Sequence, residues 1–148
     1  MKKILVFIKN NENELLLLRG SEHDPQFHES FWYTVTGSEE DVDKSLTDTV
    51  KREVKEETNL DVKNVCYLNW ILKYNSLGQD CEEYVFICDL EREFTIVLNE
   101  ENIEYKWCGL YDFVYTIKWH GDKAVLKKVL ELALKNKPFF DEEKITNM

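Results

Sequence analysis

The sequence contains few residues that interrupt regular structure: two prolines and five glycines among 148 residues. Together with 43 % hydrophobic and 13 % aromatic residues, this composition excludes a collagen-like chain and argues against intrinsic disorder. The length fits a single folded domain, which we expect over residues 1–137, followed by a charged tail over 138–148.

Paired cysteines and long hydrophobic runs are also missing. The four cysteines are scattered and form no C-x-x-C pair, so we expect buried reduced thiols rather than zinc ligands or a redox couple. The apolar run at 4–8 is too short for a membrane span, and no signal-peptide cleavage site follows it. We therefore predict a cytoplasmic protein with no membrane partner.

Basic residues are in the minority, with 19 Lys and Arg against 29 Asp and Glu and a net charge of −10. No basic cluster stands out, which argues against polymeric nucleic acid as a partner, because phosphate binding relies on Lys and Arg. An acidic protein that handles phosphates would need metal ions to mediate the contact.

The most informative stretch runs from 37 to 60. Ser45 is a natural N-cap, and Asp48 three residues later completes a capping-box pattern. Asn59 can adopt the left-handed conformation that ends a helix. Apolar residues recur every fourth position between these marks, so we predict a helix that buries the stripe Leu46, Val50 and Val54.

Three acidic residues share another face of this predicted helix. Glu53, Glu56 and Glu57 are spaced i, i+3 and i+4, so their carboxylates lie close together and repel one another. Hard divalent cations bound by oxygen ligands would relieve that repulsion. The alternative is an ordinary solvated helix, on which Arg52 pairs with Glu56 at i+4.

The remaining pattern predicts a layered α/β fold. Apolar runs and alternation indicate strands over 3–8, 14–19, 31–38, 62–74 and 81–90, and a second amphipathic helix over 122–134. No element is predicted for 110–118, where aromatic residues are irregularly spaced. This order of elements favours a mixed β-sheet between helices, an α/β/α sandwich.

The run RE-V-K-EE-T-N-L at 52–60 resembles the second half of the Nudix box, G-x5-E-x7-R-E-U-x-E-E-x-G-U with U aliphatic. The matching positions are Arg52, Glu53, Val54, Glu56, Glu57 and Leu60. The first half of the box departs from this pattern. Ser38 stands where the box has glycine, Lys44 stands where it has glutamate, and Asp43 is the nearest acid. Asn59 replaces the final glycine, a lenient change because asparagine also tolerates positive φ.

Two further stretches resemble one branch of the Nudix superfamily, the dihydroneopterin triphosphate and dATP pyrophosphohydrolases. Residues 31–38 are similar to its FW-x-x-VTGS segment, and 101–107 are similar to its E-x4-KW segment, which places a glutamate at Glu101. The resemblance implies a Nudix-type α/β/α sandwich with a mixed sheet. It further implies a metal-dependent hydrolase that cleaves a nucleotide or pterin triphosphate to monophosphate and pyrophosphate.

The resemblance also implies roles for individual residues. Mg²⁺ or Mn²⁺ would be held by Glu53, Glu56 and Glu57, and Arg52 would orient Glu53. The catalytic base would be either Glu53 or Glu101, and the sequence does not choose between them. Glu100 and Glu104 are alternatives to Glu101, and each of these acids has the simpler interpretation of an exposed loop residue.

Three residues are candidates for substrate binding. Arg19 ends the second predicted strand near the expected substrate, Trp119 could stack on a base or pterin, and Lys123 could meet a phosphate. Surface charge, core packing and solvation are the alternatives for the three. A dinucleoside polyphosphate or nucleotide-sugar hydrolase and a non-catalytic nucleotide-sensing module remain alternative functions. The chain would act on its small-molecule substrate as a monomer or homodimer.

Overall fold

The computed structural model describes residues 1–20, 30–92 and 95–135. Within these ranges the chain forms, in order, β1 (Lys2–Lys9), β2 (Leu15–Gly20), β3 (Trp32–Tyr33), β4 (Val35–Ser38), α1 (Leu46–Thr58), β5 (Val62–Ser76), β6 (Gln79–Leu90), β7 (Asn102–Cys108), α2 (Leu110–Thr116) and α3 (Lys123–Leu134).

The sheet is mixed and is built around β1. Along its whole length β1 pairs in parallel with β6, which pairs antiparallel with β5. Its other edge is shared: β4 pairs antiparallel with the first half of β1, whereas β2 pairs with it only where Lys9 meets Leu15. From there β2 continues the sheet by pairing with β3 and β7.

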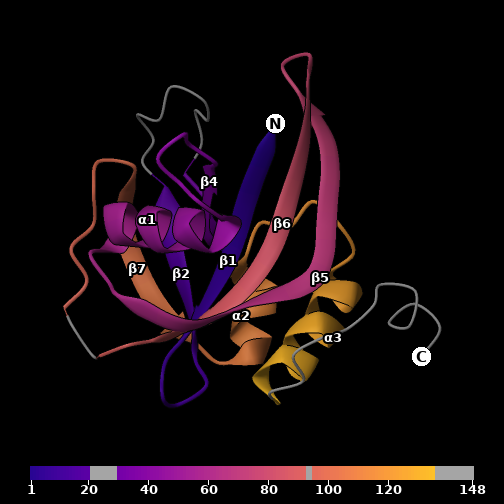
Figure 1. The fold of residues 1–148 in the computed structure, drawn as a ribbon. Coiled ribbons are helices and arrows are strands. Elements are labelled where there is room, and N and C mark those ends of the chain that lie inside the picture. The colour runs from indigo at the N-terminus through magenta and orange to yellow at the C-terminus, as the bar shows by residue number, and fades with distance from the viewer. Residues whose placement is uncertain (21–29, 93–94, 136–148) are drawn as a thin grey trace.

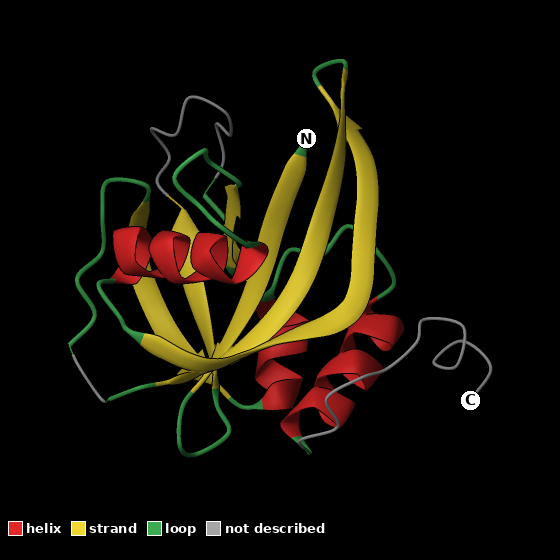
Figure 2. Ribbon diagram, in the orientation of Figure 1, coloured by secondary structure: helices red, strands yellow, loops and turns green. Residues whose placement is uncertain are grey.

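Helices cover both faces of this sheet, as Figures 1 and 2 show. α1 lies across one face, whereas α2 and α3 pack on the other, and the far ends of β5 and β6 extend beyond α2 and α3. Alternate residues of β1 divide between the two layers, with Leu5 and Phe7 facing α2 and α3 while Ile4, Val6 and Ile8 face α1. The predicted α/β/α sandwich is therefore confirmed.

The caps of α1 form as the sequence predicts. The Ser45 side chain accepts a hydrogen bond from the Asp48 backbone N–H at 3.2 Å. Asn59 ends the helix in the left-handed region with φ of 64° and donates its N–H to the Lys55 carbonyl. Val50 and Val54 are fully buried against the sheet. Local sequence signals thus determine where α1 begins, where it ends and which face it buries.

Three predicted features were wrong. The single strand expected over 31–38 is two strands, because the chain passes from the edge of β2 to the edge of β1 at Thr34, whose hydroxyl bonds the Val6 carbonyl. Residues 110–116, given no element, form α2, which buries Phe113 and Val114 against the sheet. The strands predicted over 62–74 and 81–90 instead span 62–76 and 79–90, so they are separated by a turn at Leu77 and Gly78, both with positive φ.

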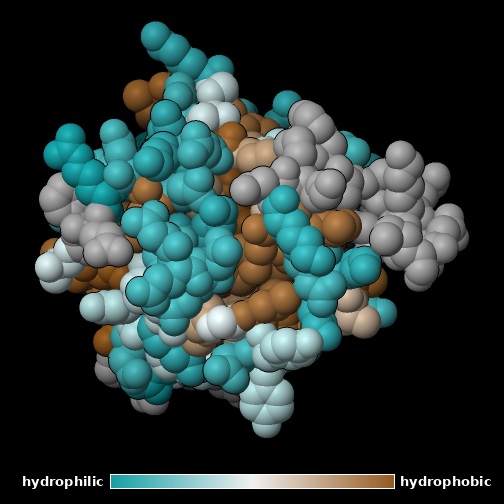
Figure 3. Space-filling model, turned by 90° about the horizontal axis from the view of Figure 1, so that it is seen from below, coloured by the Kyte–Doolittle hydropathy of each residue, from teal (hydrophilic) through white to brown (hydrophobic). Residues whose placement is uncertain are grey.

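Other predictions concern the chain as a whole. Cys81, Cys88 and Cys108 are buried, as expected, whereas Cys66 is only partly buried. In the described ranges, no helix is long and apolar enough to cross a membrane. Seen from below, hydrophobic residues remain visible between hydrophilic ones (Figure 3). His23, His28 and the tail predicted at 138–148 lie outside the described residues.

Candidate active site

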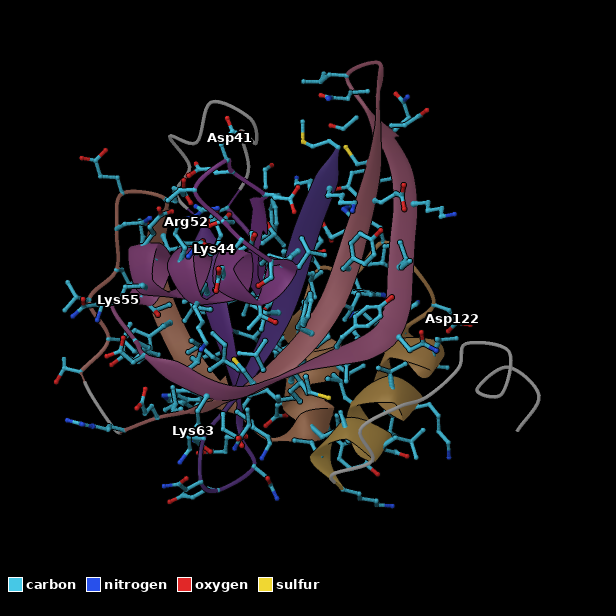
Figure 4. The ribbon with its side chains drawn as sticks, in the orientation of Figure 1. Asp41, Lys44, Arg52, Lys55, Lys63 and Asp122 are labelled. Atoms are coloured by element: carbon cyan, nitrogen blue, oxygen red, sulfur yellow. The ribbon has the colours of Figure 1, made fainter. Side chains whose placement is uncertain are left out.

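Arg52, in the middle of α1, connects the helix to the loop that precedes it. Its guanidinium donates two hydrogen bonds to the Asp43 carboxylate, at 3.0 and 2.9 Å, and a third to the Ser38 carbonyl at 2.9 Å. The Arg52 bonds hold the pKa of Asp43 well below its usual range. Asp43 therefore supplies the acid that pairs with Arg52, although the Nudix pattern places a glutamate one residue later. Figure 4 shows Arg52 beside this loop, which carries Asp41.

The same guanidinium lies between two of the predicted metal ligands. Nη1 of Arg52 donates to Glu53 Oε1 at 3.0 Å and to Glu56 Oε1 at 3.3 Å. The i+4 pair considered for a solvated helix is therefore present. Arg52 supplies positive charge to these two acids, so their mutual repulsion alone does not demand a metal ion.

Glu53 is held against the backbone of β4. A Cβ atom added at Gly37 would overlap the Glu53 side chain, so a glycine at 37 provides the space that this carboxylate fills. Burial raises the pKa of Glu53, and the negative charges of Glu56 and Glu101 add to this effect, whereas Arg52 opposes it. Sequence reasoning aligned Ser38 with the glycine of the box and missed this contact of Gly37.

Glu57 is the most unusual acid of the group. Its residue is 7 % exposed, and Oε1 accepts one hydrogen bond from the Asn102 amide at 3.1 Å. Oε2 is buried and has no hydrogen-bond partner among the residues that the structure describes. Burial raises the pKa of Glu57 to about 8, and the nearby charges of Glu101, Glu53 and Glu56 contribute. An oxygen left this way is costly unless a ligand, cation or proton satisfies it.

The loop before β7 brings Glu101 toward the same acids. Its charge acts on both Glu53 and Glu57, and its neighbour Asn102 makes the hydrogen bond to Glu57. The alternative Glu104 instead forms an ion pair with Arg19. Of these loop acids, Glu101 is the one whose charge contributes to raising the pKa of Glu53 and Glu57, whereas Glu104 pairs with Arg19.

The donor chemistry of this cluster fits a hard divalent cation, because Glu57 offers a buried oxygen without a partner and the surrounding acids offer more. The donors are not already gathered as a finished site. Among the described residues, no three acidic, His or Cys side chains are arranged as a metal site. Arg52 accounts for this in part, since its guanidinium holds Glu53 and Glu56.

A cavity of about 670 Å³ lies on the other face of the sheet. Its lining includes Thr36 of β4, and the next residue, Gly37, lies under Glu53 on the α1 side. One strand therefore separates the cavity from the acids. Aromatic side chains dominate its inner wall, which is formed by Phe31, Tyr33, Trp70 and Trp119. A cavity of this size and character suits a flat organic ring.

The three substrate-binding candidates have different positions. Trp119 lines the cavity and stacks on Tyr33, with ring centroids 6.3 Å apart. Lys123 does not line it, and its ammonium group donates to the Tyr115 carbonyl at 3.0 Å. Arg19 follows Leu17 on the face of β2 away from α1 and pairs with Glu104, so it lies outside the acid cluster.

Comparison with known proteins identifies the family of the chain. The NUDIX domain model matches residues 1–129. The chain therefore belongs to the Nudix family, as its sequence motif predicted.

One curated relative and two solved structures are similar to this chain over most of its length. Dihydroneopterin triphosphate diphosphatase from Haemophilus influenzae is 27 % identical over 143 residues, and the match covers 87 % of each chain. A protein of Listeria monocytogenes classed as a NUDIX hydrolase has a TM-score of 0.71 at 24 % identity, covering 95 % of this chain and 99 % of that one. Dihydroneopterin triphosphate pyrophosphohydrolase from E. coli has a TM-score of 0.68 at 23 % identity, covering 91 % and 95 %. These similarities support an enzyme of the Nudix hydrolase family.

Proposed function

We propose that this enzyme cleaves a nucleotide or pterin triphosphate to a monophosphate and pyrophosphate with the help of Mg²⁺ or Mn²⁺. The observation that carries the proposal is the buried, unpartnered Oε2 of Glu57 beside Glu53 and Glu101. An aromatic-lined cavity on the far side of β4 supports the same substrate class, since its size and lining suit a flat ring.

The proposed metal ligands are Glu53, Glu56 and Glu57. When bound, the cation would neutralise phosphate oxygens and lower the pKa of an attacking water. Arg52 holds Glu53 and Glu56 on one side through its guanidinium, and Asp43 fixes that guanidinium from the other. Because these bonds occupy oxygens that an ion would need, ion binding would require Glu53 and Glu56 to share or exchange their contacts with Arg52.

The proton acceptor in this proposal is Glu53 or Glu101. Glu53 is partly shielded, and burial raises its pKa toward the range useful for a base at neutral pH. Glu101 lies on an exposed loop, and its negative charge contributes to raising the pKa of both Glu53 and Glu57. Replacing each by glutamine and comparing the pH dependence of kcat distinguishes them, because removal of the base eliminates the acidic limb.

Trp119 is proposed to face the substrate ring. It lines the cavity, yet its contacts with Phe7, Tyr33 and Trp70 keep it part of the aromatic core. This packing fixes the indole plane, so stacking a ring on it orders no additional side chain. Lys123 and Arg19 would have to leave their present partners to reach a phosphate, so their proposed roles carry less support.

The test is to incubate the protein with Mg²⁺ and a panel of nucleoside triphosphates, pterin triphosphate, dinucleoside polyphosphates and nucleotide sugars, and to identify both products. Pyrophosphate with a monophosphate supports the proposal. Preferential cleavage of the last two substrate groups supports the alternative hydrolase, and binding without turnover supports a sensor.

Variants test whether the acid cluster carries out the hydrolysis. Glu57→Gln should reduce turnover at least 100-fold, because it removes a proposed metal ligand while keeping the side-chain shape. Glu131→Gln on α3 is the matched control, since within the described part of the chain Glu131 has only a long ion pair, with Lys127 at 3.9 Å. Equal activity of the two variants would remove Glu57 from the proposed site.

A further inference from the structure

A second buried acid, Glu83, lies in the floor of the cavity. Alternation along β6 places it on the face that also carries Val85 and Ile87, both buried in the core beneath α2 and α3. In the sheet it sits between Lys3 of β1 and Leu72 of β5. Glu83 therefore occupies a core-facing position at the point where the sheet extends past the helices and the cavity begins.

The surroundings of Glu83 satisfy it only in part. The residue is 5 % exposed, and its Oε2 accepts a hydrogen bond from the Tyr74 hydroxyl at 2.9 Å. Burial raises its pKa, the Tyr74 hydrogen bond and the charge of Lys3 oppose this, and the described residues provide no ion pair for it. A buried carboxylate without an ionic partner is unfavourable for stability, so a role in recognition is a reason to keep it.

The rings that enter an enzyme pocket differ in what they offer a carboxylate. A 2-amino-4-oxo pyrimidine ring, the unit shared by guanine and pterins, presents a ring N–H beside an amino group, two parallel donors that match the two oxygens of a carboxylate. Adenine and cytosine present one amino group beside an acceptor nitrogen. Uracil and thymine present one N–H between two carbonyl acceptors, which a carboxylate repels.

We propose that Glu83 determines ring specificity by accepting two hydrogen bonds from a 2-amino-4-oxo pyrimidine edge, with Tyr74 as the positioning residue. Three observations combine here: the carboxylate lines the cavity, Tyr74 fixes one of its oxygens, and the aromatic wall of Tyr33, Trp70 and Trp119 provides stacking surface above it. The inference rests on the proposed function for its substrate class, but the ring itself can be tested without hydrolysis.

The chain offers a matched control on the adjacent residue. Glu82 precedes Glu83 on β6 and likewise accepts a hydrogen bond from a tyrosine, Tyr84, at 3.2 Å, but it is exposed and does not line the cavity. Glu82→Gln and Glu83→Gln therefore make the same chemical change on opposite faces of one strand. Any difference between the two variants therefore reflects the position of Glu83 in the cavity and not the loss of one negative charge.

The first experiment measures kcat and KM in Mg²⁺ for dGTP, dITP, dATP and dihydroneopterin triphosphate. The wild-type enzyme should prefer dGTP and the pterin, and dITP, which lacks the amino group, should be intermediate. Glu83→Gln should raise KM for dGTP and the pterin by about 10- to 100-fold, with kcat and the dATP reaction little changed. Tyr74→Phe should shift KM in the same direction by a smaller factor, and Glu82→Gln should shift nothing.

The second experiment needs no turnover and measures binding of guanosine, adenosine and neopterin by tryptophan fluorescence. Glu83→Gln should weaken guanosine and neopterin binding but not adenosine binding, and the ratio of the first two shows which source of the shared edge the cavity prefers. Ring-selective binding without hydrolysis would overturn the proposed function but keep this inference. Hydrolysis with no ring preference, or a preference that persists in Glu83→Gln with unchanged thermal stability, would overturn this inference alone.

Discussion

Gly37→Ala should disable the acid cluster without touching any charged residue. A Cβ at this position would come within 3.0 Å of three Glu53 side-chain atoms, closer than real Cβ atoms approach. Gly37 has no positive φ, so alanine is compatible with its backbone. The strain must therefore be relieved by moving the Glu53 carboxylate by about 1 Å, because the β4 backbone is held by pairing with β1.

A displacement of this size is large for a group that orients a metal ion or a water. We expect kcat/KM to fall by about 100-fold, since misplacement of a positioned group by ~1 Å can have that effect. Overpacking should also lower the free energy of unfolding by about 1–3 kcal/mol, measured by urea denaturation. Shortening the acid in Gly37→Ala/Glu53→Asp should recover most of the stability but not the rate.

Gly109→Ala is the matched control for the effect of alanine on the unfolded chain. A Cβ at 109 would meet no atom within 4 Å, and its backbone φ is −63°. The difference between the two variants isolates the contact with Glu53. If Gly37→Ala matched Gly109→Ala in both activity and urea midpoint, the assigned contact between β4 and Glu53 would be wrong.

Three other predictions concern α1. Burial raises the pKa of Glu57 from 4.5 to about 8, so the folded protein keeps a proton that the unfolded chain releases. The free energy of unfolding in EDTA should therefore fall as pH rises from about 5 to 8, by about 5 kcal/mol at most. A Tm that does not change over this pH range would contradict this prediction. Glu57→Gln should remove that slope, and Mn²⁺ in place of EDTA should restore the lost stability at pH 8.5. Arg52→Lys should lose the two-point contact with Asp43 and lower kcat/KM at least 10-fold, whereas retention of full activity would show that the charge alone suffices. At the left-handed position of Asn59, glycine should change stability by less than about 1 kcal/mol and valine should cost about 1–2 kcal/mol by chemical denaturation; equal effects would argue against the cap.

The sequence predicts α1 well because its signals are local. Ser45, Asn59 and the valine stripe lie within fifteen residues, and each acts on its own helix. The acids of the cluster are likewise on one helix, apart from Glu101, which needed a family resemblance to be found. α2 was missed because seven residues give too short a pattern, and its formation depends on burying Phe113 and Val114 against a distant sheet.

The contacts that define the site chemically are long-range, and periodicity cannot reveal them. Asn102 reaches Glu57 across 45 residues, and the overlap between position 37 and Glu53 involves a strand and a helix. Glu83 looks like an ordinary acid in an alternating strand until the sheet places it in the floor of the cavity. A proline or glycine can indicate a turn from sequence alone, but a buried carboxylate is recognised only once its neighbours are assembled.

The position of β4 between the two halves of the site has a consequence for how related enzymes could diverge. Thr36 and Gly37 are consecutive, yet one borders the cavity and the other supports an acid of the opposite layer. Substitutions on the cavity side can therefore exchange one substrate family for another while the hydrolytic apparatus stays intact. A shift of the β4 backbone would instead damage selectivity and turnover together. Substitutions that move this strand should therefore be tolerated far less than substitutions in the cavity wall.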